Sequence, residues 1–592
     1  MKFPYGICDF RKITTKGYFY CDRSDRIPLL ERAEYQLFLR PRRFGKSLLL
    51  SMLANYYDVA KKDEFDTMFG HLKIGQNPTE LRNSYFILKW DFSCVDPTGT
   101  AADIKKGLWN HINSRIKGFI RYYENFDLHG IEVNPDDVLT SIDSLISAVR
   151  MTAYPIYLLI DEYDNFANQV MMGVQRDSQE MYEALVHEAG PLRTLFKTVK
   201  ASASESLFDR IFITGVSPVV MSDITSGYNI ATNIYLYPQF NDICGITEEE
   251  IHGALEELTG KCVFGEKDIR TAPDMMRIWY NGYRFSPDAD SFVYNPTLCL
   301  YFLDYLELNR KYPRRMLDTN LATDDAKLDY IAQVSAGRQM LLELLREDRT
   351  VSVSDISDRF GIREMLTEER KNHEFMASFL CYFGVLTIKG EEPDGRISLK
   401  IPNLVIRGLY AERICEMLLP DPSLRDEGKN AARQLYEKGH MEPVCAFIEN
   451  HYFRVFGNRD YRWANELTVK TAFLTLLYND TLYVMDTESE LDRRYADLTM
   501  IIRPDMRRFT ILDILIEFKF VPLKESGLSG EEARNLSEEE LRHLPSVHKQ
   551  MEEAKKQVED YGKVLEKRFG NLRLRKFAVV SLGFERLRWA EV

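Results

Sequence analysis

Residues 35–57 read YQLFLRPRRFGKSLLLSMLANYY, and this stretch decides the fold of the N-terminal half. The apolar run Tyr35–Leu39 predicts a buried strand, and the apolar run after Ser47 predicts a helix. Between them lies Gly45-Lys46-Ser47, in the strand, turn and helix context that a phosphate-binding loop requires. In such a loop, backbone N–H groups bind phosphate, the lysine reaches the β/γ oxygens and the serine ligates Mg²⁺. The stretch therefore predicts a P-loop domain that binds ATP.

The loop departs from the GxxxxGK[ST] pattern at its first position, where Arg40 replaces glycine in RPRRFGKS. On the GKS tripeptide alone, a basic turn before a core helix remains an alternative, because so short a match arises by chance in a long chain. As a nucleotide site, the loop would use these residues: Arg42, Arg43, Phe44, Gly45, Lys46, Ser47 and Leu48.

A second apolar run, Ile156–Ile160, ends in Asp161-Glu162 more than a hundred residues after the loop. A carboxylate at the end of such a strand is where Mg²⁺ is held, and the adjacent glutamate can orient the attacking water. An acidic pair after a strand is by itself commonly a solvated strand end. Combined with Lys46, it favours an ATPase with Asp161 as a metal ligand and Glu162 as a catalytic residue.

Two further buried strands are expected at Tyr85–Trp90 and Arg210–Thr214, the second of which ends in Thr214-Gly215. Thr214 has two interpretations. It is either a polar sensor between the nucleotide and water, or a strand-end hydroxyl that caps the following turn.

Several segments in this order resemble those of the bacterial AAA-ATPase-like family: YGICDFRKITTKGYFYCDRS, LFLRPRRFGKSLLLSML, YLLIDEYDNF, IFITGVSPVVMSDITSGYNI and WYNGYRF. The resemblance covers about the first 300 residues. It implies a fold on the AAA/STAND side of the P-loop NTPases. The family's loop has the same RPRRFGKS form, so Arg40 looks like a family trait.

The composition limits the class of protein. The net charge of −13 gives no global positive field for nucleic acid. No stretch approaches 18 consecutive apolar residues, and the N-terminus lacks the apolar core of a secretory signal, so no membrane partner is expected. The nine cysteines are scattered from Cys8 to Cys445 without a CxxC pair, which suits a reducing, cytoplasmic location.

The fold class is α/β, and the pattern divides the chain into three parts. Residues 1–245 alternate strands and helices, as expected of the P-loop domain. Residues 246–425 are mainly helical, starting where Thr247 and Glu250 form a capping-box pattern. Within them, VSVSDISDRFGI and ASFLCYFGVLTIKGEEPDGRISLKIPN look like helices plus a β-hairpin, a winged-helix arrangement. Residues 430–592 form a third unit, in which the charged stretch 523–545 is expected to be an exposed insertion.

Two carboxylates and a lysine recur in the third part. Asp497 lies in the apolar context YADLTMII, and Glu517-Phe518-Lys519 ends the run ILDILIEFKF. Because strand side chains alternate, Glu517 and Lys519 point to the same face. Two carboxylates plus water can hold Mg²⁺, and the lysine can position an attacking water near a phosphodiester. Glu466, on a predicted helix, would complete the metal shell. Most such combinations are strand-end salt bridges, which is the alternative.

The order of these residues, followed by Gln557 and Tyr561 on one predicted helix, resembles the PD-(D/E)XK nuclease superfamily. The resemblance implies a restriction-endonuclease-like α/β domain with catalytic residues Asp497, Glu517 and Lys519 and metal ligands Glu466, Asp497 and Glu517. Relatives often carry Gly-Arg shortly before the aspartate, whereas Arg494-Tyr495-Ala496 precede it here. This departure affects the expected binding of the substrate more than that of the metal ion, because the carboxylates and the lysine are all present.

Residues 563–588 contain eight Lys or Arg side chains that either contact DNA phosphates or form solvated faces. The leading hypothesis is an ATPase whose nucleotide state controls a Mg²⁺-dependent DNA nuclease. One rival is a nucleotide-dependent switch or scaffold whose nuclease-like domain only binds nucleic acid or protein. Homo-oligomerisation stays open.

Overall fold

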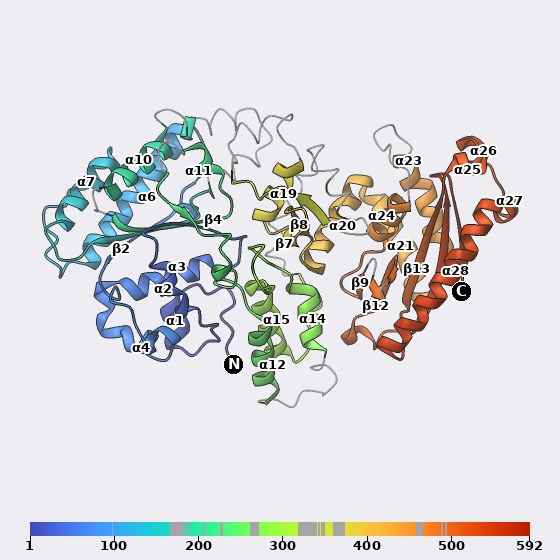
Figure 1. Ribbon diagram of the computed structural model, residues 1–592, viewed down its shortest axis with the longest axis horizontal. Helices are drawn as coiled ribbons and strands as arrows, with labels where there is room; N and C mark the ends of the chain where they lie inside the picture. Colours follow the sequence, from blue (N-terminus) through green and yellow to red (C-terminus); the bar gives the residue numbers. More distant parts are fainter. Residues whose placement is uncertain are drawn as a thin grey trace. The chain divides into compact units, whose positions relative to one another are not determined.

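In the computed structural model, the predicted N-terminal strands lie side by side in one parallel sheet (Figure 1). The strand order is β2-β3-β4-β1-β5. The strands are β1 (Tyr35–Leu39), β2 (Phe86–Asp91), β3 (Ile156–Asp161), β4 (Phe208–Gly215) and β5 (Thr232–Asn233). All four strands expected from the apolar runs are confirmed. Because the strands are parallel, their carboxyl ends meet at one edge, where ligands of open α/β sheets bind.

The structure describes the following residues: 1–96, 99–165, 184–186, 190–204, 208–224, 229–260, 271–317, 340, 344, 350–358, 373–456, 466–486, 489–491 and 494–592. They belong to two compact units. The first comprises Met1–Phe264, Ala272–Arg310 and Thr350–Pro402, and the second comprises Gly265–Thr271, Lys311–Arg349 and Asn403–Val592. The predicted boundaries between three domains stay a prediction.

Helices lie on both faces of the first sheet. One face carries α3 (Lys46–Tyr57), with α1 (Phe10–Thr15) and α4 (Phe65–Phe69) beyond it, and the other carries α6 (Ala101–Tyr122), α7 (Val138–Val149) and α10 (Pro191–Ser204) (Figure 1). The α3 layer is apolar: Leu50 and Leu53 are fully buried together with strand residues Phe38 and Phe212. Each such side chain contributes roughly 1.5–3 kcal/mol relative to an exposed one. This packing fixes the start of α3 against the end of β1.

The rest of the first unit is mainly helical, as expected. Its helices are α12 (Glu248–Gly260), α14 (Ala272–Tyr280), α15 (Pro296–Asn309) and α19 (His373–Tyr382). The capping box at α12 is confirmed, since the Thr247 N–H donates to Glu250 Oε2 at 2.9 Å and the Glu250 N–H donates to Thr247 Oγ1 at 3.4 Å.

The predicted β-hairpin of the winged-helix region is confirmed as β7 (Thr387–Glu391) and β8 (Ile397–Lys400). The stretch VSV is part of a third strand, β6 (Thr350–Val353), which pairs antiparallel with β8 and whose side chains alternate between half-buried and buried. The last residues of VSVSDISDRFGI, from 359 on, lie outside the described residues.

The second unit has a mixed five-stranded sheet of order β15-β14-β13-β12-β9. Its strands are β9 (Tyr483–Asp486), β12 (Leu498–Ile502), β13 (Asp513–Val521), β14 (Leu574–Leu582) and β15 (Arg586–Glu591). Strand β12 pairs antiparallel with both β9 and β13, and β14 is parallel to β13. In chain order, α24 (Glu466–Leu477) comes before these strands, and α28 (Pro545–Phe569) connects β13 to β14.

The stretch 523–545, expected to be an exposed insertion, forms three short helices: α25 (Leu523–Ser526), α26 (Gly530–Arg534) and α27 (Glu538–His543). Capping boxes at Ser529 and Ser537 start the last two. Ala533 and Leu541 are fully buried against Val521 and Leu582. The expectation was therefore wrong in part, because a few apolar side chains anchor this charged stretch to the sheet.

Among the residues that the structure describes, no helix is both long enough and apolar enough to cross a membrane.

Candidate functional site

The loop between β1 and α3 has the backbone shape of a phosphate cradle. Gly45, immediately before α3, has a φ of +84°, and Arg43 has a φ of +65°. A glycine is needed at position 45 because side chains disfavour this left-handed conformation. The loop leaves the first N–H groups of α3 without helical partners, and a helix start of this kind attracts anions.

Arg40 has no positive φ, so the backbone does not require the glycine that the pattern has there. Its side chain is 2% exposed and points into the protein. The guanidinium donates to the carbonyls of Leu39 and Tyr235 from Nη1 and to that of Phe240 from Nη2. It also lies over the Phe285 ring, 4.1 Å from the centroid. Arg40 therefore anchors the loop.

The predicted WYNGYRF segment packs against the same loop. Phe44 is fully buried, and its ring makes edge contacts with Tyr283 at 4.8 Å and Phe285 at 5.2 Å between centroids. Thr297, at the start of α15, donates its hydroxyl to the Arg43 carbonyl at 2.7 Å. The segment is therefore part of the core, and it supports the loop that precedes Lys46.

Lys46 is the first residue of α3 and is 6% exposed. Its Nζ donates to the carbonyls of Arg40 at 2.9 Å and Pro41 at 3.1 Å. Burial lowers the pKa of Lys46, and the carboxylates of Glu162, Asp164 and Asp161 partly oppose this shift. The ammonium is therefore held at the loop beside the acidic end of β3. The next side chain, Ser47, is partly exposed.

Strand β4 lies between β1 and β3, which brings Thr214 next to Asp161. The Thr214 hydroxyl donates to Asp161 Oδ1 at 2.6 Å, and both residues are buried. The hydroxyl thus orients the carboxylate, a role that neither interpretation of Thr214 included. Asp161 keeps its second oxygen for another contact.

Glu162 follows β3 with a φ of +49°, an uncommon conformation for a side-chain-bearing residue. Burial raises the pKa of its carboxyl, and the charges of Lys46 and Arg42 act in the opposite direction. Strained backbone of this kind occurs at functional sites when the surroundings hold it in place.

Sequence reasoning missed the residue that holds this turn. Asp164 is 1% exposed and accepts from the N–H groups of Val216 and Ser217, the latter at 2.8 Å. Gly215 allows this approach, because an added Cβ would lie 2.4 Å from the Tyr163 ring. The signal was available in IDEYD, whose second aspartate comes three residues after the first.

A mainly apolar pocket opens beside the loop and encloses about 610 Å³, part of it open to solvent. Its lining includes Gly45 and Leu48 of the loop and α3, Tyr20 and Cys21 of the N-terminal segment, and Ile243 and Ile246. Ligand pockets are lined mainly by apolar side chains of this kind. The predicted residue Leu48 therefore lies at the pocket, next to the cradle.

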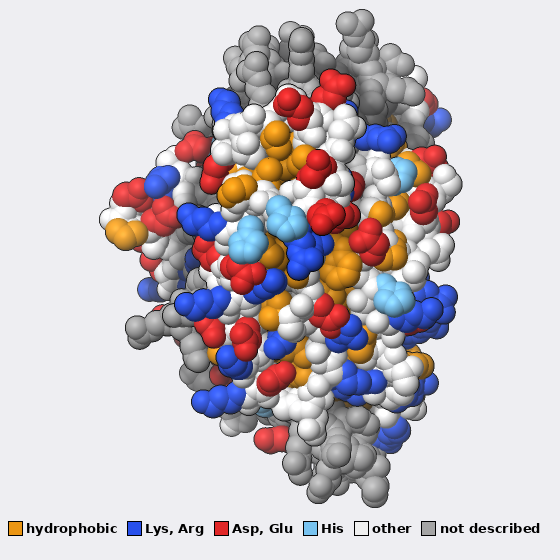
Figure 2. Space-filling view, turned by 90° about the vertical axis from the view of Figure 1, so that its right-hand side faces the viewer, with side chains coloured by type: hydrophobic (Ala, Val, Ile, Leu, Met, Phe, Trp, Pro, Cys, Tyr) orange, Lys and Arg blue, Asp and Glu red, His pale blue; other side chains and the backbone are white. Residues whose placement is uncertain are grey.

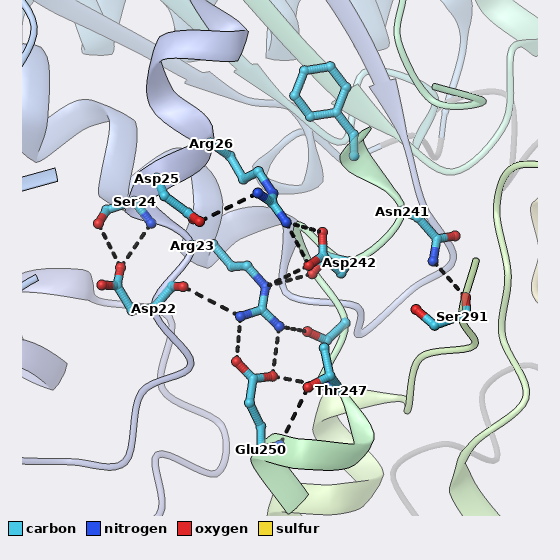
Figure 3. Close-up of polar contacts among 12 residues, drawn as sticks. Asp22, Arg23, Ser24, Asp25, Arg26, Asn241, Asp242, Thr247, Glu250 and Ser291 are labelled. Atoms are coloured by element: carbon cyan, nitrogen blue, oxygen red, sulfur yellow. Dashed lines mark hydrogen bonds and ion pairs between the residues drawn. The ribbon is translucent and has the colours of Figure 1, made fainter. Parts of the chain in front are cut away.

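Arg23 is part of the lining of this pocket, and Figure 3 shows the polar contacts that hold it. It is 7% exposed and forms a two-pronged ion pair with Glu250, at 2.5 and 2.7 Å. It also donates to the carbonyls of Asp242 and Gly245. Arg26 pairs with the Asp242 carboxylate at 2.9 Å. The network ties the CDRS segment to the start of α12.

We expect Arg23→Met to lower the free energy of unfolding of the first unit by about 3 kcal/mol, because a buried pair that loses one partner leaves the other charge uncompensated. Arg26→Met is the matched control. Its side chain is 28% exposed, so its loss should cost about 1 kcal/mol or less. Chemical denaturation followed by tryptophan fluorescence measures both. Equal losses for the two variants would contradict a special role for Arg23.

In the second unit, the structure brings four predicted residues and one unpredicted residue together. Lys470, on α24, lies 3.0 Å from Glu466 Oε1 and 2.6 Å from Asp497 Oδ1. Asp497 Oδ2 accepts from the Phe518 N–H at 2.6 Å. Asp497 is 6% exposed and directly precedes β12. Sequence reasoning missed Lys470, although its spacing from Glu466, four residues on a helix, was visible.

Glu517 and Lys519 share a face of β13, as the strand alternation predicted. Lys519 Nζ lies 3.1 Å from Glu517 Oε1. Glu517 Oε2 is buried and has no hydrogen-bond partner among the described residues. Burial and the neighbouring Asp497 carboxylate raise the pKa of Glu517 to about 8. An unpaired, buried carboxylate oxygen is costly, and a cation would relieve that cost.

The remaining predicted positions are less decisive. Tyr561, on α28, belongs to an apolar cluster with Ala496 and Leu515. Gln557 Oε1 is buried and has no hydrogen-bond partner among the described residues. The side chains of Arg494 and Tyr495 lie outside the described residues. Within the described residues, no group of at least three His, Cys, Asp or Glu side chains is arranged to hold a metal ion.

Four of the eight basic side chains in residues 563–588 lie in ion pairs with acidic side chains. Arg575 pairs with Glu591, and Arg586 and Arg588 pair with Glu538. Lys563 pairs with Glu559. The face on the α27–α28 side shows basic and acidic side chains interspersed (Figure 2). These contacts favour the solvated-face alternative over a DNA-contacting stripe.

A family model matches the N-terminal part of the chain, and one relative matches most of its length. Residues 4–225 match the family AAA-ATPase_like, described as "Predicted AAA-ATPase". An uncharacterized protein in the vnfD 5′ region of Azotobacter chroococcum mcd 1 is 25% identical over 541 residues, which are 89% of this chain and 90% of that protein.

A solved structure, that of the Aeropyrum pernix ORC1 protein in complex with DNA, matches with 10% identity over 69% of this chain and 98% of that chain. Its TM-score of 0.24 does not establish a shared fold. The family match confirms the first resemblance over residues 4–225, while its extension to about residue 300 and the nuclease resemblance stay predictions. Residues 4–225 match the model of a predicted AAA-ATPase-like domain, and this match supports a nucleotide-binding ATPase.

Proposed function

We propose that the first unit binds ATP with Mg²⁺ and hydrolyses it at the carboxyl edge of its parallel sheet. The main support is that three features lie at that edge: the Gly45 cradle, the Lys46 ammonium and the Thr214–Asp161 hydrogen bond. In this proposal Arg42, Arg43 and Phe44 shape the cradle, whose N–H groups hold the phosphates. Lys46 leaves the Arg40 and Pro41 carbonyls to contact the β/γ oxygens.

Ser47 and Asp161 fit Mg²⁺, because a hydroxyl and a carboxylate are the oxygen ligands it prefers. When bound, Mg²⁺ neutralises charge on the phosphates. Thr214 orients Asp161 through its hydrogen bond. Glu162 orients the attacking water and accepts its proton. The apolar pocket beside Leu48 receives the base.

We expect Glu162→Gln to bind ATP with nearly unchanged affinity and to hydrolyse it roughly 10²- to 10⁴-fold more slowly, the range in which a general base contributes. Because burial raises the pKa of Glu162, the wild-type rate should begin to fall, as the pH decreases, above the usual range of a glutamate. Steady-state phosphate release across pH, together with nucleotide titration, measures both quantities.

The control for this variant is Glu124→Gln, an exposed glutamate in the same unit. It should leave rate and affinity unchanged. If Glu162→Gln lost ATP affinity while remaining folded, the residue would have a structural role instead.

For the second unit we propose a Mg²⁺-dependent nuclease that acts on DNA and is controlled by the nucleotide state of the first unit. The support is the convergence of Glu466, Asp497, Glu517 and Lys519, and the unpaired Glu517 Oε2 provides the test of fit to a cation. Asp497 and Glu517, with Glu466, would hold Mg²⁺, which when bound lowers the pKa of a coordinated water. Lys519 positions that water or the phosphate.

A second candidate function rests on Lys470. Its ammonium already neutralises Glu466 and Asp497, an arrangement suited to a nuclease-like domain that only binds nucleic acid or protein. The ATPase would then act as a switch or scaffold. Incubation of the protein with supercoiled and linear DNA, with Mg²⁺ or Mn²⁺ and with each nucleotide, distinguishes the two. Cleavage under no condition, with DNA binding retained, would favour the switch.

A further inference from the structure

The Lys470 ammonium occupies a cation position between two of the proposed metal ligands. It lies 2.6 Å from Asp497 Oδ1 and 3.0 Å from Glu466 Oε1. Its side chain is 9% exposed, as is that of Asp497. Lys470 therefore does not behave as a surface lysine that samples many rotamers. Its position is fixed by two carboxylates, one on its own helix and one at the start of β12.

The other contacts at the site leave Lys470 as the main counter-charge for Asp497. Asp497 Oδ2 is taken by the Phe518 N–H, and Lys519 contacts Glu517 instead. A divalent cation that binds Asp497 through Oδ1 would need the oxygen that Lys470 now contacts. Mg²⁺ requires an oxygen distance of about 2.0–2.1 Å, so the ammonium and the metal ion would be close neighbours of like charge. Such charges repel strongly at a buried site.

We propose that Lys470 is a built-in counter-ion that competes with a divalent cation for Asp497 and Glu466, so that the C-terminal site binds metal weakly until this ammonium withdraws. The inference rests on the proposed metal site and describes how that site is regulated. Glu466 is 32% exposed, which leaves a route for the ammonium toward solvent on that side. The arrangement also agrees with the absence of a ready-made three-ligand metal group among the described residues.

The test is Mn²⁺ binding to the full chain without nucleotide, measured by isothermal titration calorimetry. Lys470→Met keeps an unbranched side chain and removes the charge. We expect Lys470→Met to bind Mn²⁺ at least about 10-fold more tightly than wild type, within the range over which neighbouring side chains tune metal affinity. Lys470→Arg, which keeps the charge, should bind as weakly as wild type. The double variant Lys470→Met/Asp497→Asn should lose the gain.

Thermal unfolding supplies a second readout. Without metal, Lys470→Met should melt below wild type because Asp497 loses its partner, and Mn²⁺ should raise its melting temperature more than that of wild type. Lys470→Gln replaces Lys470→Met if the latter does not fold. Lys555→Met is the matched control, since Lys555 also pairs within its helix, with Glu552, but on the exposed side of α28. It should change neither readout.

The outcomes separate this inference from the proposed function. If wild type binds Mn²⁺ in an Asp497-dependent manner and Lys470→Met binds no more tightly, Lys470 is only a structural partner and the inference is overturned. If neither wild type nor Lys470→Met binds Mn²⁺ at Asp497, the metal site itself is wrong, and the nuclease proposal fails with it.

Discussion

Lys46→Ala should reduce ATP hydrolysis by about 10²- to 10³-fold or more, the scale on which a single donor to developing charge contributes. Lys46 is the first residue of α3, and burial lowers the pKa of its ammonium. The ammonium therefore contributes to catalysis through its positive charge, which would stabilise the negative charge on the phosphate oxygens. Nucleotide affinity should also weaken, because the lysine contacts the β/γ oxygens in the bound state as well.

The measurement is phosphate release at saturating ATP, with affinity from a fluorescent nucleotide titration. Lys62→Ala is the control, since Lys62 is an exposed lysine in the short helix Val59–Glu64 that follows α3. It should leave both values unchanged. A folded Lys46→Ala protein with wild-type hydrolysis would mean that the RPRRFGKS loop is the alternative considered at the outset, a basic turn before a core helix.

The sequence predicted the N-terminal architecture well because its signals are local. A short apolar run that ends in a polar pair, as in Ile156–Glu162, is visible without any tertiary information. The Thr214 hydroxyl could not be assigned to Asp161, since that contact depends on β4 lying between β1 and β3. Strand order in a sheet is set by long-range packing, and two readings of Thr214 were therefore left open.

Arg40 shows a different limit. The glycine-based pattern concerns backbone conformation, and only the structure reveals that position 40 has no positive φ while Arg43 does. The partners of the Arg40 side chain, the carbonyls of Tyr235 and Phe240, lie about two hundred residues away. No local signal links them. A resemblance to a family could suggest that the arginine is tolerated, but the physical reason is its anchoring role.

In the C-terminal unit, the predicted carboxylates and Lys519 were correctly placed on neighbouring elements, whereas the charges around them were misjudged. Lys470 was not predicted, and its ammonium contacts Asp497 from a different element, α24. The basic segment was predicted either to contact DNA or to form solvated faces. Three of its arginines (Arg575, Arg586 and Arg588) pair with acidic partners on other elements, Glu591 and Glu538. A count of charges along a sequence does not include pairing across the fold.

Asp497→Asn should reduce Mg²⁺-dependent DNA cleavage by roughly 10²-fold or more, the contribution expected of a group needed to activate the attacking water. Asparagine keeps the shape and can still accept the Phe518 N–H, so the strand should stay in place. The substitution removes the Asp497 charge that Lys470 contacts, while the Lys470–Glu466 ion pair stays. It also removes one metal ligand from the proposed site. ATP hydrolysis without DNA should stay near wild type, because Asp497 belongs to the other compact unit.

The assay is a time course on supercoiled and linear DNA with Mg²⁺, Mn²⁺ and EDTA, alongside phosphate release for each variant. Asp426→Asn is the matched control, since that side chain is 75% exposed on α21 (Pro422–Lys438) in the same unit. Glu517→Gln should behave like Asp497→Asn, and Lys519→Ala should slow cleavage with less effect on metal binding. Wild-type cleavage that Asp497→Asn leaves intact would show that the reaction does not use this cluster, and cleavage would then have to be assigned to other residues of the chain.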